Sequence, residues 1–384
     1  MYILILTAAT GGGHAKAASA LKEYMEKHIS GCRVDIVDAL KYISPLVEKV
    51  ITGTYLKAIR NVPGVYGRLY DLSEKDESIS GMVKGFNGVL AHGLYSLFER
   101  DKPDVVICTH TVPLHMVSRM KQKGLLDAPV IGIVTDYTNH YFWKLDEIDA
   151  LVVAHDCIKE DMVRIGIREE IIHTCGIPVC ERFTSDPQPD RKYLLKKTGL
   201  DYKPTILVMG GSLGFSGMCG IFSSLLELER DIQVIAVTGH NKKLKDRLDS
   251  ISRGSRKKTK IFGYTDNISD LMGASDLIIT KPGGITVSEA LVRKLPLIIV
   301  TPIPGQEERN ARFLANSEAA FLLSPSDDME TVLRRTLDRP GVLRKMSEAA
   351  DRLAKPRACE DIMALVKTLV KTEPEVLCVS RSFR

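Results

Sequence analysis

Short apolar runs alternate with longer stretches of helical periodicity along most of this chain, and this alternation limits the possible folds more than any other feature. Near-continuous apolarity in a short β-branched run indicates a strand buried on both faces, as in a parallel sheet covered by helices. We therefore expect an α/β protein. The predicted strands form two consecutive series, residues 2–8, 33–37, 104–109, 130–135, 150–154 and 171–176, and then 205–209, 233–238, 260–262, 277–280 and 297–301.

The chain has 384 residues, which exceeds what one hydrophobic core usually organises, so each strand series should form its own domain. We predict two Rossmann-like domains that face each other across a cleft, an N-terminal one over 1–177 and a C-terminal one over 204–355. The proline-rich segment 178–203 is the predicted hinge. A last helical stretch, within about 356–384, is a candidate to pack back on the N-terminal domain.

Composition excludes several classes of protein. With 44% hydrophobic and 26% charged residues the chain is typical of a globular protein, and a net charge of +5 is far from that of a nucleic-acid binder. No apolar run is long enough to span a bilayer, and the N-terminus resembles a first strand more than an export signal. The 8 cysteines include no Cys-x-x-Cys pair, which argues against a zinc or disulfide framework and favours the cytoplasm.

Residues 44–100 separate two predicted strands by much more than an ordinary crossover. The part from Lys49 to Tyr70 is basic and contains tyrosines but no acidic residue. Such a segment suits either a membrane surface with anionic headgroups or a helix packed on the sheet, and the sequence leaves both open. Apolar residues then recur at helical spacing from Ile79 to Phe98, which predicts a helix with one buried face.

Two glycine-rich turns follow predicted first strands. Residues 10–14 read TGGGH, and residues 209–214 read MGGSLG. Glycines at a strand-to-helix turn allow close approach of a ligand, and the helix start that follows favours anions. His14 adds an imidazole that can accept a proton near neutral pH. The alternatives are a structural histidine in the first turn and a plain tight turn in the second.

The third motif is the most specific. Residues 281–290, KPGGITVSEA, follow a predicted strand, so a phosphate could bind at the start of the helix while the carboxylate of Glu289 accepts hydrogen bonds from ribose hydroxyls. After the next strand, residues 302–310 read PIPGQEERN, and Gln306, Glu307 and Asn310 should lie at a helix start where they can contact sugar hydroxyls.

These segments carry a family resemblance. GGGH, the segment TDYTNHYFW after the fourth strand, GGS, KPGGITVSEA and GQEERNARFL together resemble the family of monogalactosyldiacylglycerol synthases and processive diacylglycerol glucosyltransferases. The resemblance covers nearly the whole chain and implies the GT-B fold and an inverting transfer of glucose or galactose from a UDP-hexose to diacylglycerol. It also implies a peripheral protein on the inner face of the cell membrane.

The resemblance further implies roles for individual residues. His14 matches the general base. The residues that match UDP-sugar contacts are Gly211, Ser212, Gly239, Gly263, Tyr264, Gly283, Gly284, Thr286, Glu289, Gln306, Glu307 and Asn310. Gly12, Gly13, Asp136 and Trp143 fall on the acceptor side. The chain has no Asp-x-Asp pair, so we expect no metal and no cofactor, with the helix start and backbone donors stabilising the diphosphate.

Other activities remain open at this point. A polyprenyl-diphosphate-linked acceptor would use the same donor site. A UDP-N-acetylglucosamine 2-epimerase would share the two-domain architecture without needing an acceptor. A sensor of nucleotide sugars is a non-enzymatic alternative, although it would not need a base at His14.

Overall fold

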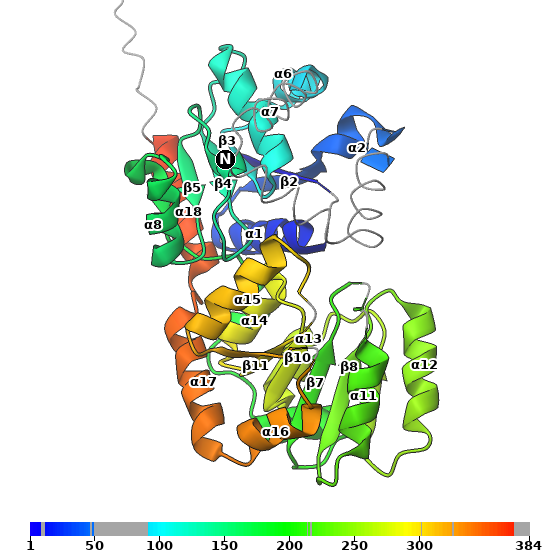
Figure 1. Cartoon of the computed structure of the whole chain (residues 1–384). Helices are drawn as coiled ribbons and strands as arrows, with labels where there is room; N and C mark the ends of the chain where they lie inside the picture. Colours follow the sequence, from blue (N-terminus) through cyan, green and yellow to red (C-terminus); the bar gives the residue numbers. More distant parts are fainter. Residues whose placement is uncertain are drawn as a thin grey trace, which may run out of the picture.

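The computed structural model describes residues 1–8, 12–46, 48–49, 91–212, 214–215, 217–300, 302–324 and 326–371. It shows two stacked α/β domains, each built on a six-stranded parallel sheet with helices on both faces (Figure 1). The predicted α/β class and the parallel sheets are thus confirmed. The basic and aromatic segment 51–70, and most of the helix predicted from Ile79, lie outside the described residues.

The N-terminal sheet has the order β2-β1-β3-β4-β5-β6. Its strands are β1 (Tyr2–Thr7), β2 (Arg33–Asp38), β3 (Val105–Cys108), β4 (Val130–Ile133), β5 (Ala150–Val152) and β6 (Ile172–His173). Its helices are α1 (Gly12–His28), α2 (Ala39–Ile43), η1 (Ala91–Leu94), α6 (Tyr95–Asp101), α7 (Thr111–Gln122), η2 (Tyr141–Trp143), α8 (Asp156–Arg164) and η3 (Glu169–Ile171).

The second sheet has the order β12-β11-β10-β7-β8-β9. Its strands are β7 (Thr205–Met209), β8 (Gln233–Val237), β9 (Thr259–Phe262), β10 (Leu277–Thr280), β11 (Leu297–Ile299) and β12 (Ala320–Leu322). The helices from here to the chain end are α9 (Glu181–Thr184), α10 (Arg191–Thr198), α11 (Met218–Glu227), α12 (Lys242–Ser252), α13 (Ile268–Ala274), α14 (Gly284–Val292), α15 (Gln306–Asn316), α16 (Met329–Leu337), α17 (Pro340–Leu353) and α18 (Ala358–Lys371).

Every predicted strand is present. The inner strands such as β3, β7 and β10 are buried on both faces of their sheets, whereas the edge strands β2 and β9 are partly exposed. Successive side chains of β1 point to opposite faces of the N-terminal sheet. Ile3 and Ile5 pack in the core on one face, and Leu4 and Leu6 pack in the core on the other. The described end of the helix predicted from Ile79 is also buried, since Leu94, Leu97 and Phe98 pack in the core. Strand β12 was not predicted. It is an edge strand of only three residues within the apolar run 319–323, which is too short to indicate a strand by itself.

Both sheets reverse their strand order at one point, between β1 and β3 and between β7 and β10. Open α/β sheets bind ligands outside the carboxyl ends of the strands at such switch points. In the first sheet these ends point toward the start of α1 and into Thr109. In the second they lead into Gly210 and into the turn before α14. The strand order alone therefore indicates that a ligand binds at the glycine-rich segments.

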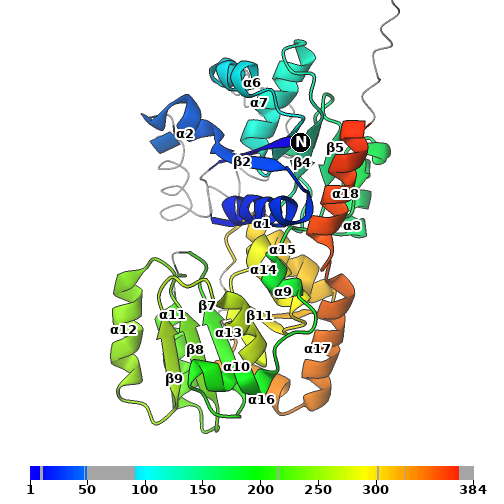
Figure 2. The same ribbon diagram turned by 180° about the vertical axis from the view of Figure 1, so that it is seen from behind.

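The chain crosses between the domains twice. Segment 178–203 leads into the C-terminal domain, and its part from α10 onward is already packed there, with Leu194 and Leu195 buried among that domain's apolar residues. After α17 the chain returns, and Ile362 and Val366 of α18 pack with Ile3 and Ile5 of β1 (Figure 2). The two crossings touch, because a Cβ placed on Gly176 would overlap the side chain of Lys355.

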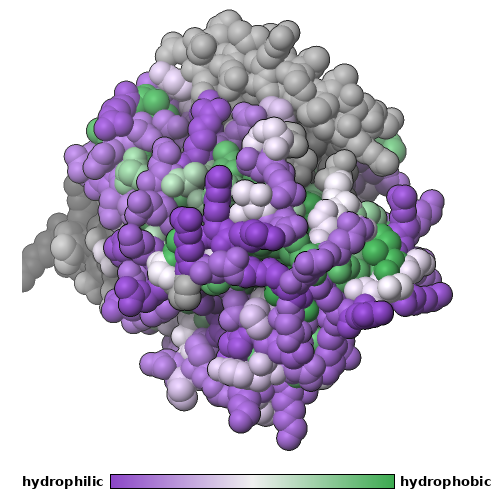
Figure 3. Space-filling view, turned by 60° about the horizontal axis from the view of Figure 1, so that its bottom comes forward, coloured by the Kyte–Doolittle hydropathy of each residue, from purple (hydrophilic) through white to green (hydrophobic). Residues whose placement is uncertain are grey.

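The surface face in Figure 3 is mainly hydrophilic, with apolar residues scattered between polar ones. Within the described ranges, none of the helices combines the length and apolarity needed to cross a bilayer.

Candidate active site

The two glycine-rich turns lie opposite each other where the domains meet. A Cβ placed on Gly12 would lie 3.7 Å from Cβ of Ser212, and one placed on Gly13 would lie 3.4 Å from Cγ1 of Ile285 in α14. Small residues on the N-terminal side thus let the start of α1 come close to the C-terminal domain. Figure 1 shows α1 directly above α14 and α15. The structure therefore brings the first, second and third sequence motifs together, although Thr10, Gly11 and Leu213 lie outside the described residues.

His14 is held by the ends of two neighbouring strands. Its Nδ1 lies 2.7 Å from the carbonyl oxygen of Thr109, after β3, and 2.9 Å from Oγ1 of Thr135, after β4. A carbonyl oxygen only accepts hydrogen bonds, so Nδ1 carries the ring proton and donates it to Thr109. In the neutral ring Nε2 then has the free lone pair, which is the requirement for a general base.

The surroundings of His14 favour this neutral form. Burial lowers its pKa below the usual 6.5, and the hydrogen bond to the Thr109 carbonyl opposes the shift in part. Its position in the first turn of α1 also disfavours the imidazolium, because the start of a helix carries partial positive charge. The ring of His110 meets that of His14 edge to face at 4.6 Å, and burial keeps the pKa of His110 well below its ordinary value too.

The start of α14 lies against the N-terminal domain. A Cβ on Gly284 would overlap the carbonyl oxygen of Thr135 and lie 3.3 Å from Cα of Asp136, so only glycine allows this approach. A Cβ on Gly283, in contrast, would meet no atom within 4 Å. The backbone N–H groups at a helix start attract anions, so the space beside Gly283 suits a phosphate group. Thr286 is partly exposed one turn into the same helix.

The second glycine turn and the loops after β8 and β9 form one tight arrangement. The N–H of His240 donates to the carbonyl oxygen of Ser212 at 2.8 Å. Gly239 has φ +61°, and a Cβ there would overlap that same carbonyl. Tyr264 is exposed and stacks on His240 with the ring centroids 4.5 Å apart. The predicted nucleotide residues therefore lie next to one another, and Ser212 is the one shown to approach Gly12 of the N-terminal domain. They are Gly211, Ser212, Gly239, Gly263 and Tyr264.

Glu289 is a buried carboxylate with an unpaired oxygen. It is 5% exposed, and its Oε2 has no hydrogen-bond partner among the described residues. Burial raises its pKa to about 7, against the charges of Lys16 and Arg182, which lower it. An orphaned acceptor in a buried position is costly, and a ribose hydroxyl is the kind of group that would satisfy it.

Replacing Glu289 by glutamine should change stability and ligand binding in opposite directions at high pH: the protein should become more stable relative to wild type and bind UDP more weakly. The folded-state pKa of Glu289 is raised, so this carboxyl favours folding below its unfolded pKa of 4.5 and loses that contribution as the pH rises through about 7. Chemical denaturation measures the unfolding free energy of both proteins. The value for E289Q minus that for wild type should rise by about 1–3 kcal/mol from pH 4.5 to pH 8. The affinity of E289Q for UDP should fall about tenfold or more.

Glu181→Gln is the matched control. Hydrogen bonds from Lys27 and His28 lower the pKa of Glu181, so its contribution to folding is present above its unfolded pKa of 4.5 and is lost mainly at lower pH. From pH 4.5 to pH 8 the stability of E181Q relative to wild type should therefore change little. A pH-independent difference for E289Q would contradict the buried, ionisable carboxylate.

Three residues predicted on different sides of the site form one cluster. Oδ1 of Asp136 accepts a hydrogen bond from Nδ2 of Asn310 at 2.9 Å, and Oδ2 accepts one from Nε2 of Gln306. Asp136 comes from the N-terminal domain and the two amides from α15. Burial raises the pKa of Asp136 to about 7, and the two amide donors partly reverse this shift. The residue predicted on the acceptor side therefore contacts the residues predicted to bind the donor sugar.

Two other predicted residues lie in different surroundings from those expected. Glu307 forms an ion pair with Lys281 at 2.9 Å and accepts a hydrogen bond from the N–H of Ile303 at 2.8 Å, so both of its oxygens have partners within the C-terminal domain. Trp143 is 7% exposed and packs in the core of the N-terminal domain. It can support the loop that follows β4, but its buried ring does not line the surface of the site.

Sequence reasoning missed the residues that support the site. Thr109 and Thr135 orient His14, and Tyr137 links the domains through its hydroxyl, 2.8 Å from Oγ of Ser288. A signal was available for the threonines, because both end predicted strands and the carboxyl ends of neighbouring parallel strands share one edge. No sequence pattern marked Tyr137 as a contact.

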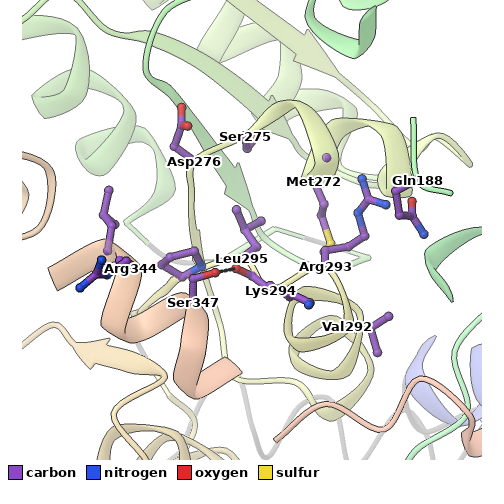
Figure 4. A pocket seen from close by; sticks show the side chains of 13 residues that line it. Gln188, Met272, Ser275, Asp276, Val292, Arg293, Lys294, Leu295, Arg344 and Ser347 are labelled. Atoms are coloured by element: carbon purple, nitrogen blue, oxygen red, sulfur yellow. Dashed lines mark hydrogen bonds between the residues drawn. The ribbon is translucent and has the colours of Figure 1, made fainter. Parts of the chain in front are cut away.

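A separate pocket of about 440 Å³ lies away from this site. It is bounded by α13, the loop after α14, and α17, with Arg293, Lys294 and Arg344 among its lining side chains (Figure 4). None of the predicted site residues lines it.

Two Rossmann-type domains that meet through glycine-rich helix starts, with a histidine near their junction, are the arrangement of a GT-B glycosyltransferase. Residues 14–179 match the family model of monogalactosyldiacylglycerol (MGDG) synthase, and residues 205–362 match that of the glycosyltransferase family 28 C-terminal domain. The processive diacylglycerol beta-glucosyltransferase of Bacillus cereus (strain AH820) is 31% identical over 382 residues, which cover 97% of this chain and 95% of that protein. The chain belongs to this family of diacylglycerol glycosyltransferases.

Solved structures agree on the fold. Acinetobacter baumannii MurG superimposes with a TM-score of 0.62 at 16% identity, covering 96% of this chain and 99% of that one. The S. aureus MnaA–UDP co-structure gives a TM-score of 0.63 at 14% identity, covering 97% and 99% of the two chains. At these identities the likeness concerns the fold alone.

Proposed function

We propose that this enzyme transfers a hexose from a UDP-hexose to the hydroxyl of diacylglycerol, with His14 as the general base. The main support for the proposal is the position of His14. Its Nδ1 donates a hydrogen bond to the carbonyl oxygen of Thr109, and the start of its helix, α1, packs against α14 through Gly13 and Ile285. The sequence relatives support the substrates, because the Bacillus cereus protein is named for glucosyl transfer to diacylglycerol over nearly the same length.

The reaction follows from this arrangement. Nε2 of His14 takes the proton of the acceptor hydroxyl as that oxygen forms a bond to the anomeric carbon. The bond from the anomeric carbon to the phosphate oxygen breaks, and UDP leaves with the electron pair. The helix start at Gly283 and Gly284 stabilises the negative charge that develops on the diphosphate. Glu289 accepts hydrogen bonds from the ribose, and closure of the domains excludes the water that would otherwise hydrolyse the donor.

The proposal also covers where the enzyme acts and whether it needs a metal ion. The enzyme works at a membrane surface, on the inner face of the cell membrane, because its acceptor is a lipid. Transfer requires no metal ion, since backbone N–H groups and the helix start supply the electrostatic stabilisation that a divalent cation would otherwise give.

A single assay tests these points. The protein is incubated with labelled UDP-glucose or UDP-galactose and with vesicles that do or do not contain diacylglycerol, each with and without EDTA. We expect label in the lipid phase only with diacylglycerol, and unchanged rates in EDTA. Transfer only to a polyprenyl-linked acceptor would overturn the acceptor, and epimerisation without any acceptor would overturn transfer itself. An EDTA-sensitive rate restored by Mg²⁺ would overturn metal independence.

A further inference from the structure

The loop that follows β4 reaches across the domain interface and touches the start of α15. Asp136 in this loop shares its two carboxylate oxygens between Asn310 and Gln306. The ionised carboxylate only accepts hydrogen bonds, and both amides turn their nitrogen toward it. One side chain of the N-terminal domain thereby contacts two amide side chains of the C-terminal domain and contributes to the orientation of both.

Asn310 shows how completely this orientation is fixed. It is fully buried, and its Nδ2 donates to the carbonyl oxygen of Pro282 at 2.9 Å as well as to Asp136. Its Oδ1 accepts a hydrogen bond from the N–H of Tyr137 at 2.8 Å. A flipped amide would place donor against donor and acceptor against acceptor, so Asn310 has one allowed orientation. It forms a rigid support one turn further along α15 from Gln306.

Gln306 is partly exposed, unlike Asn310. With its Nε2 committed to Asp136, its Oε1 points away from that carboxylate and remains an acceptor for another group. Cα of Asp136 lies beside Gly284 at the start of α14, where the diphosphate is proposed to bind, so a sugar attached to that diphosphate would be close to both residues. A hexose offers hydroxyl donors to such an acceptor.

We propose that Asp136 is a positioning residue of the donor-sugar site, which holds Gln306 so that its carbonyl oxygen accepts a hydrogen bond from a hexose hydroxyl only while the domains are closed. This inference rests on the proposed function and assigns Asp136 to the donor instead of the acceptor. The side chain that contacts the sugar, Gln306, belongs to the C-terminal domain, but its orientation depends on Asp136 of the N-terminal domain. Binding of the hexose and closure of the domains are therefore coupled, whereas binding of UDP alone is not.

The test compares the affinities for UDP-glucose and for UDP by titration calorimetry in the full-length protein. Asp136→Asn retains the size of the side chain but offers one acceptor where two are needed. We expect the affinity for UDP-glucose to fall about tenfold or more, as for the loss of a hydrogen bond to a charged group, while the affinity for UDP stays within about twofold. In transfer assays the KM for UDP-glucose should rise accordingly.

Tyr137→Phe is the matched control, because it removes the adjacent interdomain hydrogen bond to Ser288 but leaves Asp136 and Gln306 in contact. Its ratio of UDP-glucose to UDP affinity should equal that of wild type. The double variant D136N/Q306E should recover part of the lost ratio, because the amide at position 136 can then donate to the carboxylate at position 306, whose other oxygen still accepts from the sugar.

An equal loss of UDP and UDP-glucose affinity in D136N would show that Asp136 only supports closure, and would overturn the inference. Unchanged affinities for both would also overturn it. Failure of the proposed function is a separate result: the wild-type protein would then transfer no hexose to lipid, whatever the ratio of affinities in D136N.

Discussion

Replacement of His14 by alanine is expected to lower kcat for transfer by about 10²- to 10⁴-fold, the usual contribution of a general base, while the affinity for the UDP-hexose stays close to that of wild type. In the proposed mechanism His14 acts on the acceptor hydroxyl and is not part of the UDP site. Because burial holds the pKa of His14 below 6.5, its ring is neutral at pH 7, and kcat/KM of wild type should fall only as the pH drops below 6.5. Steady-state kinetics over this pH range, together with direct binding of the UDP-hexose, provide the measurements.

His28→Ala is the control for this experiment. His28 ends the same helix α1 but pairs with Glu181, away from Thr109 and Thr135. Its removal should leave kcat nearly unchanged. Near wild-type transfer by H14A, or an acid limb well above pH 6.5, would show that another group accepts the proton.

The second large effect is expected at Gly284, where alanine should block closure of the domains. Its Cβ would overlap the carbonyl oxygen of Thr135, a backbone atom that cannot rotate away, and would press on Asp136 as well. The domains must separate to relieve the overlap, which moves His14 away from the start of α14. Since a shift of about 1 Å can cost about a hundredfold in rate, we expect a loss of transfer of at least about that size. Small-angle scattering should show a more open protein.

Gly220→Ala provides the comparison. Gly220 lies in the first turn of α11 with no atom within 4 Å of a Cβ, so the same substitution there should stabilise the helix by up to about 1 kcal/mol without changing transfer. Full transfer by G284A together with unchanged scattering would mean that the close approach of Gly284 to Thr135 is not needed for catalysis.

The fold was largely predictable because burial on both faces leaves a strong trace in the sequence. The runs that became β1, β3, β7 and β10 are apolar from end to end, and their boundaries agree with the structure to within one or two residues. Strand β12 has only three residues, and its short apolar run does not distinguish a strand from a loop, because its place depends on pairing with β11. Edge pairing is a property of the assembled sheet, which a local pattern does not record.

The site was predictable only in part, for a related reason. Glycine turns at strand ends are local features, so Gly12, Gly13, Gly283 and Gly284 could be placed from the sequence at the positions where the structure has them. The contact of Asp136 with Asn310 joins residues from different domains and depends on how the domains dock. The same holds for the pairing of Glu307 with Lys281, because the loop after β11 has to fold back to the strand before α14.

The paired crossings of the chain at Gly176 and Lys355 limit how the enzyme can open. Because the two covalent connections lie at one place, we expect the domains to rotate about that place when the enzyme opens. Cys359 strengthens this point, since its Sγ lies 3.5 Å from the carbonyl oxygen of Val179 on the first crossing. In the proposed mechanism, rotation about this pivot would let the domains separate to release UDP and would return His14 to the same position for the next transfer.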